Sequence, residues 1–439
     1  MAQINKQILH IAIPSIVSNI TVPLLSLVDT TIAGHLGETA CIGAIAVGGM
    51  IFNMAYWLFS FLRMGTGGLT AQAYGAADHK ESKIVLLRSL AVAAVVSFLL
   101  IVLQYPIIEV AFSFVSATPE VEHLARQYFS ILIWGAPAVL GLYSFTGWFI
   151  GMQNARLPMV IAITQNVVNI VVSAVLVFLF HWRVEGIATG TLVAQYAGLG
   201  MALTAWCVKY RRIMPSVNWQ KVVDRVAFKN FFTINRDIFF RTFCLIAVST
   251  YFTSAGSAQG EVVLAVNTLL MQFFILFSYI SDGFAYAGEA IGGKCFGAGN
   301  VEDFKRLFRL LVLWGLAFVV LFTSIYVCLG SQLLRLFTDD NVVIRQAVGY
   351  LPYACAIPIV SFMAFIYDGL FIGCTATRYM LISMFVASAI FFSIITIFPQ
   401  SNHVLWLAFL VYLACRGAIQ ALLYPRVVKK MAIVSGKTN

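Results

Sequence analysis

One carboxyl group stands alone in a long apolar stretch near the start of the chain. Residues 18–37 read SNITVPLLSLVDTTIAGHLG, and Asp29 is the only Asp, Glu, Lys or Arg between positions 8 and 37. Burial in apolar surroundings disfavours the charged form of a carboxyl, so Asp29 is expected to take up and release a proton. Ionisable groups inside apolar helices are candidates for function. The alternative is a structural hydrogen bond to a neighbouring helix.

Two prolines lie in the same apolar stretch, at Pro14 and Pro23. A proline inside a helix has no backbone N–H to donate, so each removes one hydrogen bond of the helix. The pattern predicts a bend in this helix, and we expect the bend to change when Asp29 gains or loses its proton. The alternative is a pair of fixed kinks.

The second half of the chain carries further acids in apolar segments. Asp282 and Glu289 are seven residues apart, so they face the same side of a helix. Together with Asp368 they are candidates for binding a cation or relaying protons from a cavity. The alternative is a set of buried ion pairs, with Arg236, Arg241 or Arg416 as partners. For Asp237, which lies beside the first two of these arginines, the sequence favours a structural pair.

The composition excludes several classes of protein. Of 439 residues, 61% are hydrophobic and only 10% are charged, which is too few charges to cover a water-soluble surface. The net charge of +10 is spread over short segments, so no nucleic-acid surface is predicted. No Walker A, HExxH or GxSxG motif is present, and the eight cysteines form no CxxC pair. We expect no enzyme, no cofactor and no metal site.

Apolar segments long enough to cross the roughly 30 Å hydrocarbon core of a membrane recur along the whole chain. The first continues past the length of a signal peptide's apolar region, so no cleavable signal peptide is expected. We predict an all-α membrane protein with twelve transmembrane helices. They run approximately over residues 8–36, 43–73, 86–112, 124–151, 158–181, 186–208, 230–256, 262–292, 306–330, 346–373, 379–399 and 403–426.

The distribution of basic residues predicts the orientation. Twenty of the 28 lysines and arginines fall in segments on the side of the two termini, four fall on the opposite side, and four lie inside spans. Because positive charge accumulates on the cytoplasmic side, both termini are predicted to be cytoplasmic.

The two halves of the chain repeat each other. A shift of 222 residues places GWFIG (147–151) on GLFIG (369–373), and it places Tyr128 on Tyr350. Parallel repeats of this kind pack about an axis along the membrane normal and leave a cavity between them. We therefore predict two six-helix lobes around a central cavity. Their bounds are 1–209 for the N-terminal lobe, 210–229 for a basic cytoplasmic linker, and 230–439 for the C-terminal lobe.

The first span resembles the first helix of the multidrug and toxic-compound extrusion (MATE) family, in its DNA-damage-inducible (DinF-like) branch. Four further segments carry the same resemblance across both halves of the chain: FLRMGTGGLTAQAYGA (61–76), NRD (235–237), SDGFAYAGEA (281–290) and YDGLFIG (367–373). The resemblance implies a twelve-helix antiporter that exports organic cations or other amphiphiles while a proton or sodium ion enters.

The same resemblance implies an ion-coupling site. In related members the acid of the first helix, here Asp29, works with an asparagine and a second acid on the fifth helix and a threonine on the sixth. In this sequence Asn169 and Thr191 match the asparagine and the threonine, but Ser173 stands where the second acid is expected. Because a hard cation prefers several oxygen ligands with enough negative charge, the missing acid favours a proton over sodium.

We therefore expect a secondary active multidrug or organic cation efflux antiporter. An alternative class would have several basic residues lining the cavity to hold a pyrophosphate. That alternative is a flippase for a lipid or lipid-linked sugar, and a non-transporting receptor or channel is a third class. The expected partners are the lipid bilayer, small amphiphilic or cationic substrates and H⁺ or Na⁺, with no nucleic acid and a monomeric chain. The expected location is the bacterial inner membrane.

Overall fold

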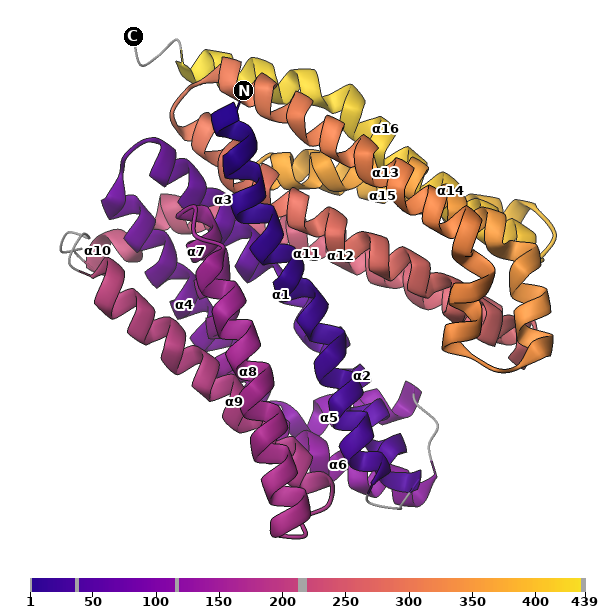
Figure 1. The fold of residues 1–439 in the computed structure, drawn as a ribbon. Coiled ribbons are helices and arrows are strands. Elements are labelled where there is room, and N and C mark those ends of the chain that lie inside the picture. The colour runs from indigo at the N-terminus through magenta and orange to yellow at the C-terminus, as the bar shows by residue number, and fades with distance from the viewer. Residues whose placement is uncertain (1, 36–38, 115–117, 212–218, 436–439) are drawn as a thin grey trace. The chain divides into compact units, whose positions relative to one another are not determined.

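The computed structural model describes residues 2–35, 39–114, 118–211 and 219–435, and every regular element in these ranges is helical (Figure 1). The all-α prediction is confirmed. In chain order the helices are α1 (Ala2–Gly34), α2 (Thr39–Leu58), α3 (Phe61–Gly75), α4 (His79–Val102), α5 (Gln104–Phe114), α6 (Pro119–Leu132), α7 (Ala136–Gly151), α8 (Arg156–Ala174), α9 (Val184–Ala205), α10 (Trp219–Val222), α11 (Arg225–Ala258), α12 (Glu261–Gly297), α13 (Val301–Phe337), α14 (Asn341–Gly373), α15 (Thr377–Ile397) and α16 (Asn402–Ser435).

Eleven segments of the described residues are long and apolar enough to cross a membrane, from Ala40–Gly75 to Asn402–Ile433. They overlap the predicted spans after the first. The first predicted span, 8–36, lies in α1, a helix of 33 residues, as far as Gly34; His35 follows the helix, and position 36 is outside the described ranges. The predicted span 86–112 is divided between α4 and α5. The division follows from Pro106, because proline has no N–H to donate to the carbonyl of Val102.

Contacts between residues divide the chain into two units, which we call the N-unit (residues 17–232) and the C-unit (residues 1–16 and 233–439). Helix α1 therefore begins in the C-unit and continues in the N-unit after Ile16, and α11 passes from the N-unit to the C-unit after Phe232. The lobes predicted from the sequence, 1–209 and 230–439, follow the internal repeat, and their boundaries stay a prediction.

A buried arginine holds part of the predicted linker against the N-unit. Arg88 of α4 is 2% exposed and donates its Nε–H to the carbonyl of Val222 and an Nη2–H to the carbonyl of Lys221, both at 3.1 Å. These carbonyls end the short helix α10 and have no partner inside that helix, so the guanidinium caps them. Residues 212–218 of the linker lie outside the described ranges.

The internal repeat reappears in the way the helices cross. Gly147 of α7 lies against the backbone of Arg63, so that a methyl group there would overlap the Arg63 carbonyl. Gly369 of α14 lies in the same way against the backbone of Ala285. Both residues of the second pair are 222 positions beyond those of the first. Glycine at these crossings lets two helix backbones come into direct contact, which a larger residue would prevent.

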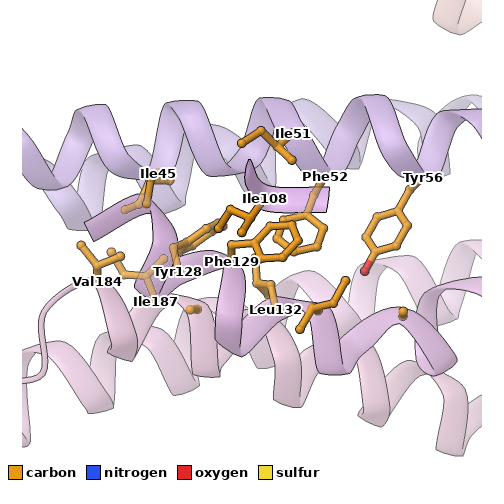
Figure 2. Close-up of a cluster of buried hydrophobic side chains, with 14 of the residues drawn as sticks. Ile45, Ile51, Phe52, Tyr56, Ile108, Tyr128, Phe129, Leu132, Val184 and Ile187 are labelled. Atoms are coloured by element: carbon orange, nitrogen blue, oxygen red, sulfur yellow. The ribbon is translucent and has the colours of Figure 1, made fainter. Parts of the chain in front are cut away.

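The core of the N-unit lies between α2, α5, α6 and α9 (Figure 2). Phe52 stacks on Phe129 with ring centroids 4.9 Å apart, and on Tyr56 at 5.5 Å. Such contacts between aromatic rings add about 0.5–1.5 kcal/mol beyond the burial of their surface. This core fixes α6 and α9 relative to each other, and α9 carries one of the predicted site residues.

The first helix is packed tightly against the C-unit over its first four turns. Gly283 of α12 faces Ala12 and Ile16, and a methyl group on Gly283 would lie 2.9 Å from the Ala12 carbonyl oxygen. Asn5 accepts a hydrogen bond of 2.8 Å from the indole N–H of Trp314. Residues 2–16 of α1 are thus held by Gly283 of α12 and Trp314 of α13, within the C-unit.

Candidate ion-coupling site

Three helices of the N-unit bring the four predicted coupling residues together. Asp29 comes from α1 and is 6% exposed, while Asn169 and Ser173 lie one turn apart on α8 and are fully buried. Thr191 of α9 is half-buried. The side chains of Asn169 and Thr191 face the Asp29 carboxyl. Residues from three separate parts of the chain therefore meet at one buried carboxyl.

Two hydrogen bonds inside this cluster have defined donors and acceptors. The amide Nδ2 of Asn169 donates to Oγ1 of Thr191 at 2.8 Å, and the Thr191 hydroxyl donates to the carbonyl of Ile187 at 3.0 Å. Within the cluster, three oxygens are buried and have no hydrogen-bond partner among the described residues: Oδ1 of Asp29, Oδ1 of Asn169 and Oγ of Ser173. A carboxyl with one unmatched oxygen in such surroundings has room to hold a proton without losing an existing contact.

The packing of α8 explains how the cluster is held. Gly190 of α9 touches Ser173, and a methyl group on Gly190 would overlap the Ser173 hydroxyl and lie 2.8 Å from its backbone nitrogen. On the other side, Asn166 donates from Nδ2 to the backbone carbonyl of Thr21 in α1 at 2.9 Å. The helix that carries Asn169 is thus fixed to both neighbours that supply the remaining groups.

Two residues near the cluster were not predicted from the sequence. Gly190 is one, because only the helix crossing shows that its lack of a side chain admits Ser173. Tyr128 of α6 is the other: it is 4% exposed and interacts electrostatically with Asp29. The sequence marked Tyr128 only as the repeat partner of Tyr350. No local pattern points from α6 to an acid on α1.

The two prolines of α1 lie on either side of the point where this helix changes unit. Pro14 is buried in the C-unit part and Pro23 is exposed in the N-unit part, and the change falls between Ile16 and Val17. The helix continues from Ala2 to Gly34 through both prolines. Each leaves a carbonyl four residues earlier without its usual N–H donor.

Of the acids in the C-unit, Asp368 is held by two arginines. Its Oδ2 accepts a hydrogen bond from Nη2 of Arg416 at 2.9 Å and another from Nη2 of Arg241, and its Oδ1 accepts one from Nε2 of Gln420. The carboxyl is 6% exposed. This geometry favours the ion-pair alternative for Asp368, because every described contact of the carboxyl is to a fixed donor.

The other C-unit acids fall into two groups. Asp237 is 3% exposed, pairs with Nη2 of Arg236 at 3.1 Å and accepts a hydrogen bond of 3.3 Å from Thr377, in line with a structural pair. On α12, Glu289 is fully buried and Asp282 is half-buried. A role for these two in a cavity stays a prediction. Among the described residues no three His, Cys, Asp or Glu side chains form a group suited to a metal ion.

The C-unit positions that correspond to the coupling cluster are not polar. A shift of 222 residues places Asp29 on Tyr251, Asn169 on Phe391 and Thr191 on Leu413. Tyr251 and Phe391 meet edge to face with ring centroids 6.1 Å apart. The repeat thus preserves a contact between the corresponding helices while its chemistry changes from hydrogen bonding to aromatic packing. A buried acid at this crossing belongs to the N-unit alone.

Comparison with known proteins agrees with this architecture. The model of the MatE family matches residues 14–175 and, a second time, residues 238–397. DNA damage-inducible protein F of Escherichia coli (strain K12) is 36% identical over 425 residues, which cover 96% of this chain and 92% of that protein. Multidrug and toxin extrusion protein 1 of Mus musculus is 22% identical over 362 residues, covering 79% and 61%.

Solved structures share the fold. A crystal structure of MATE in the bent conformation superposes with a TM-score of 0.88 at 16% sequence identity, covering 99% of this chain and 97% of that one. The straight conformation gives a TM-score of 0.82 at 18% identity, covering 98% and 97%. With the repeated family match and the identity to the Escherichia coli protein, this chain belongs to the MatE family of multidrug and toxic-compound extrusion transporters.

Proposed function

We propose that the protein is a proton-coupled antiporter that exports organic cations and other amphiphiles across the bacterial inner membrane. In this proposal it works as a monomer with both termini in the cytoplasm. The observation that carries the proposal is the placement of Asp29, a buried carboxyl that meets the side chains of Asn169 and Thr191 inside an apolar helix bundle. A carboxyl is costly to bury in a membrane-spanning helix, so it is a candidate for function.

The hydrogen bonds of the cluster suggest how one proton could be held and released. The Thr191 hydroxyl, which donates to the Ile187 carbonyl, can rotate to donate to Asp29 when the carboxyl is ionised. When Asp29 takes a proton from outside, the hydroxyl returns to the carbonyl and Asp29 no longer attracts a cationic substrate. Because the proton and the substrate exclude each other from the site, entry of a proton drives release of the substrate. A ligand can shift the transporter between two states only if it binds those states with different affinity. A proton that moves inward across the membrane releases about 2.3 kcal/mol of free energy for each 100 mV of membrane potential.

The side chain at position 173 supports a proton in preference to sodium. A sodium ion needs several oxygen ligands and favours more than one negative charge. Ser173 contributes a neutral hydroxyl, and the direct contact with Gly190 leaves little room there for a longer acidic side chain. Asp29 is the one carboxyl among the four predicted site residues, and one charge is enough for a proton.

The prolines give a means of passing this change along α1. Pro14 and Pro23 flank the point where the helix leaves the C-unit and enters the N-unit. Two missing backbone hydrogen bonds make the helix easier to bend between its two packed parts. We propose that protonation of Asp29 alters this bend. Asp282 and Glu289 of α12 stay candidates for a substrate contact in the same transport cycle.

The test is efflux of a fluorescent organic cation from reconstituted vesicles, with proton and sodium gradients imposed separately. We expect the wild-type protein to respond to the proton gradient and not to the sodium gradient. Asp29→Asn keeps the size and shape of the side chain but cannot titrate, so its efflux should fall to the level of empty vesicles.

The matched control is Glu261→Gln, which neutralises an exposed acid at the start of α12. This variant should transport like the wild type. Proton-driven efflux by Asp29→Asn at the wild-type rate, from protein with an unchanged thermal unfolding midpoint, would end the proposal. Efflux that follows sodium alone would reassign the ion.

A further inference from the structure

The C-unit contains a buried charge cluster that the transport proposal does not use. Arg241 of α11 and Arg416 of α16 both donate from Nη2 to the same oxygen, Oδ2, of Asp368 on α14. The two arginine residues are 7% and 3% exposed. Three helices that are far apart in the sequence thus meet at one carboxylate, and two positive charges share one negative charge.

Polar atoms in this cluster are left unmatched. The Nε–H groups of Arg241 and Arg416 are buried and have no hydrogen-bond partner among the described residues, and the same holds for Oε1 of Gln420. A buried N–H without an acceptor costs about 1–3 kcal/mol, and more on a charged group. Two charged donors are therefore available for an acceptor that the described side chains do not supply.

The neighbouring groups balance the second positive charge only in part. The ring of Tyr412 lies 5.6 Å from Cζ of Arg416, a cation–π contact. Asp282, half-buried on α12, interacts electrostatically with Arg416. Within the described part of the chain, the carboxylate of Asp368 is the only one that forms an ion pair within 4.0 Å with either guanidinium. An unbalanced buried guanidinium is costly, so an additional anion would stabilise the cluster.

We propose that this cluster binds one small monovalent inorganic anion of halide size, held by the Nε–H groups of Arg241 and Arg416. The site is distinct from the Asp29 cluster, which lies in the other unit. Its ligand is small because Asp368, Arg241 and Arg416 are all more than nine-tenths buried. The anion supplies the second negative charge and joins α11 to α16 beside the link through Asp368.

The test is thermal unfolding of the purified full-length protein, followed by tryptophan fluorescence, in chloride or in gluconate at equal ionic strength. Gluconate is much larger than a halide, so a site of halide size would exclude it. A ligand that binds only the folded state raises the unfolding midpoint with its concentration, by about 2 °C for each tenfold increase above its dissociation constant. We expect this rise in chloride and bromide and not in gluconate.

Variants separate this site from a general salt effect. Arg416→Gln leaves one arginine opposite Asp368, so the chloride-dependent rise should disappear. The control Arg345→Gln removes an exposed arginine from α14, and it should keep the full rise. Because Arg416→Gln could fail to fold, crystals of the wild type in bromide give a second measurement, an anomalous peak beside both Nε atoms. Equal midpoints in chloride and gluconate for the wild type would overturn the proposal, as would an equal chloride response in Arg416→Gln or an absent bromide peak.

Discussion

Ser173 and Gly190 touch across the crossing of α8 and α9, with no room for a side chain on the glycine. The contact places the serine hydroxyl at the position where the resemblance to the family predicts an acid. It also fixes the helix that presents Asn169 to Asp29. The geometry of the proposed coupling site therefore depends on a residue that has no side chain.

Replacing this glycine should damage the site. Gly190→Ala would place a methyl group on the Ser173 hydroxyl, and relieving the overlap would separate α8 from α9 at a cost of about 1–3 kcal/mol. We expect a lower thermal unfolding midpoint and slower proton-driven efflux. The control is Gly200→Ala on the same helix, where nothing lies within 4 Å, and it should be neutral or slightly stabilising. Equal behaviour of both variants would show that the contact is unimportant.

Removing the donors around Asp29 should change how transport depends on pH. Hydrogen bonds to an ionised carboxyl favour its charged form. Without them Asp29 holds its proton more tightly, so release of the proton requires a higher pH. Asn169→Ala and Thr191→Ala should each move the pH profile of efflux to more alkaline values. The control is Asn166→Ala, which removes a hydrogen bond from α8 to a backbone carbonyl of α1 and leaves the carboxyl untouched. Unchanged profiles in both test variants would remove these residues from the coupling site.

Alanine substitutions of the two prolines of α1 can separate a bend that moves during transport from a fixed kink. Pro23→Ala restores an N–H donor inside the helix, and an interior proline costs a helix about 3 kcal/mol relative to alanine. If the bend changes during transport, Pro14→Ala and Pro23→Ala should raise the unfolding midpoint and lower the efflux rate. The control is Pro425→Ala, inside α16, which should raise the unfolding midpoint and leave the efflux rate unchanged. Wild-type efflux rates in both α1 variants would mean that the kinks are fixed.

Loss of the carboxylate at position 368 should destabilise the C-unit. Asp368→Asn leaves two buried guanidinium groups without their shared partner, and breaking a buried pair in this way costs about 3–5 kcal/mol. We expect a strongly lowered unfolding midpoint and reduced yield of folded protein. Glu302→Gln, which breaks an exposed pair with Arg306 at 3.5 Å, should cost less than about 1 kcal/mol. Normal stability with lost transport would instead indicate a direct role of Asp368 in the cycle.

Much of the fold was predictable from the sequence because its signals are local or repeated. The apolar segments are longer than any loop, so the helices could be placed to within several residues. The spacing of 222 residues was visible in GWFIG and GLFIG, and the matched crossings of Gly147 with Arg63 and Gly369 with Ala285 show its physical basis. The division of the span 86–112 was missed, although Pro106 marked it.

The sequence by itself determined that Asp29 is an acid in an apolar helix and that the two halves repeat, since both follow from residue type and spacing. Only the tertiary structure decided the partners of each charge. Asp368 meets Arg241 and Arg416, which are 127 and 48 residues away, and α1 changes unit after Ile16. Helix periodicity defines which face of one helix is polar. Which helices cross, and at which residue along each helix, depends on small residues such as Gly190 at the contact. The partners of a buried carboxyl are therefore defined only by the packed bundle.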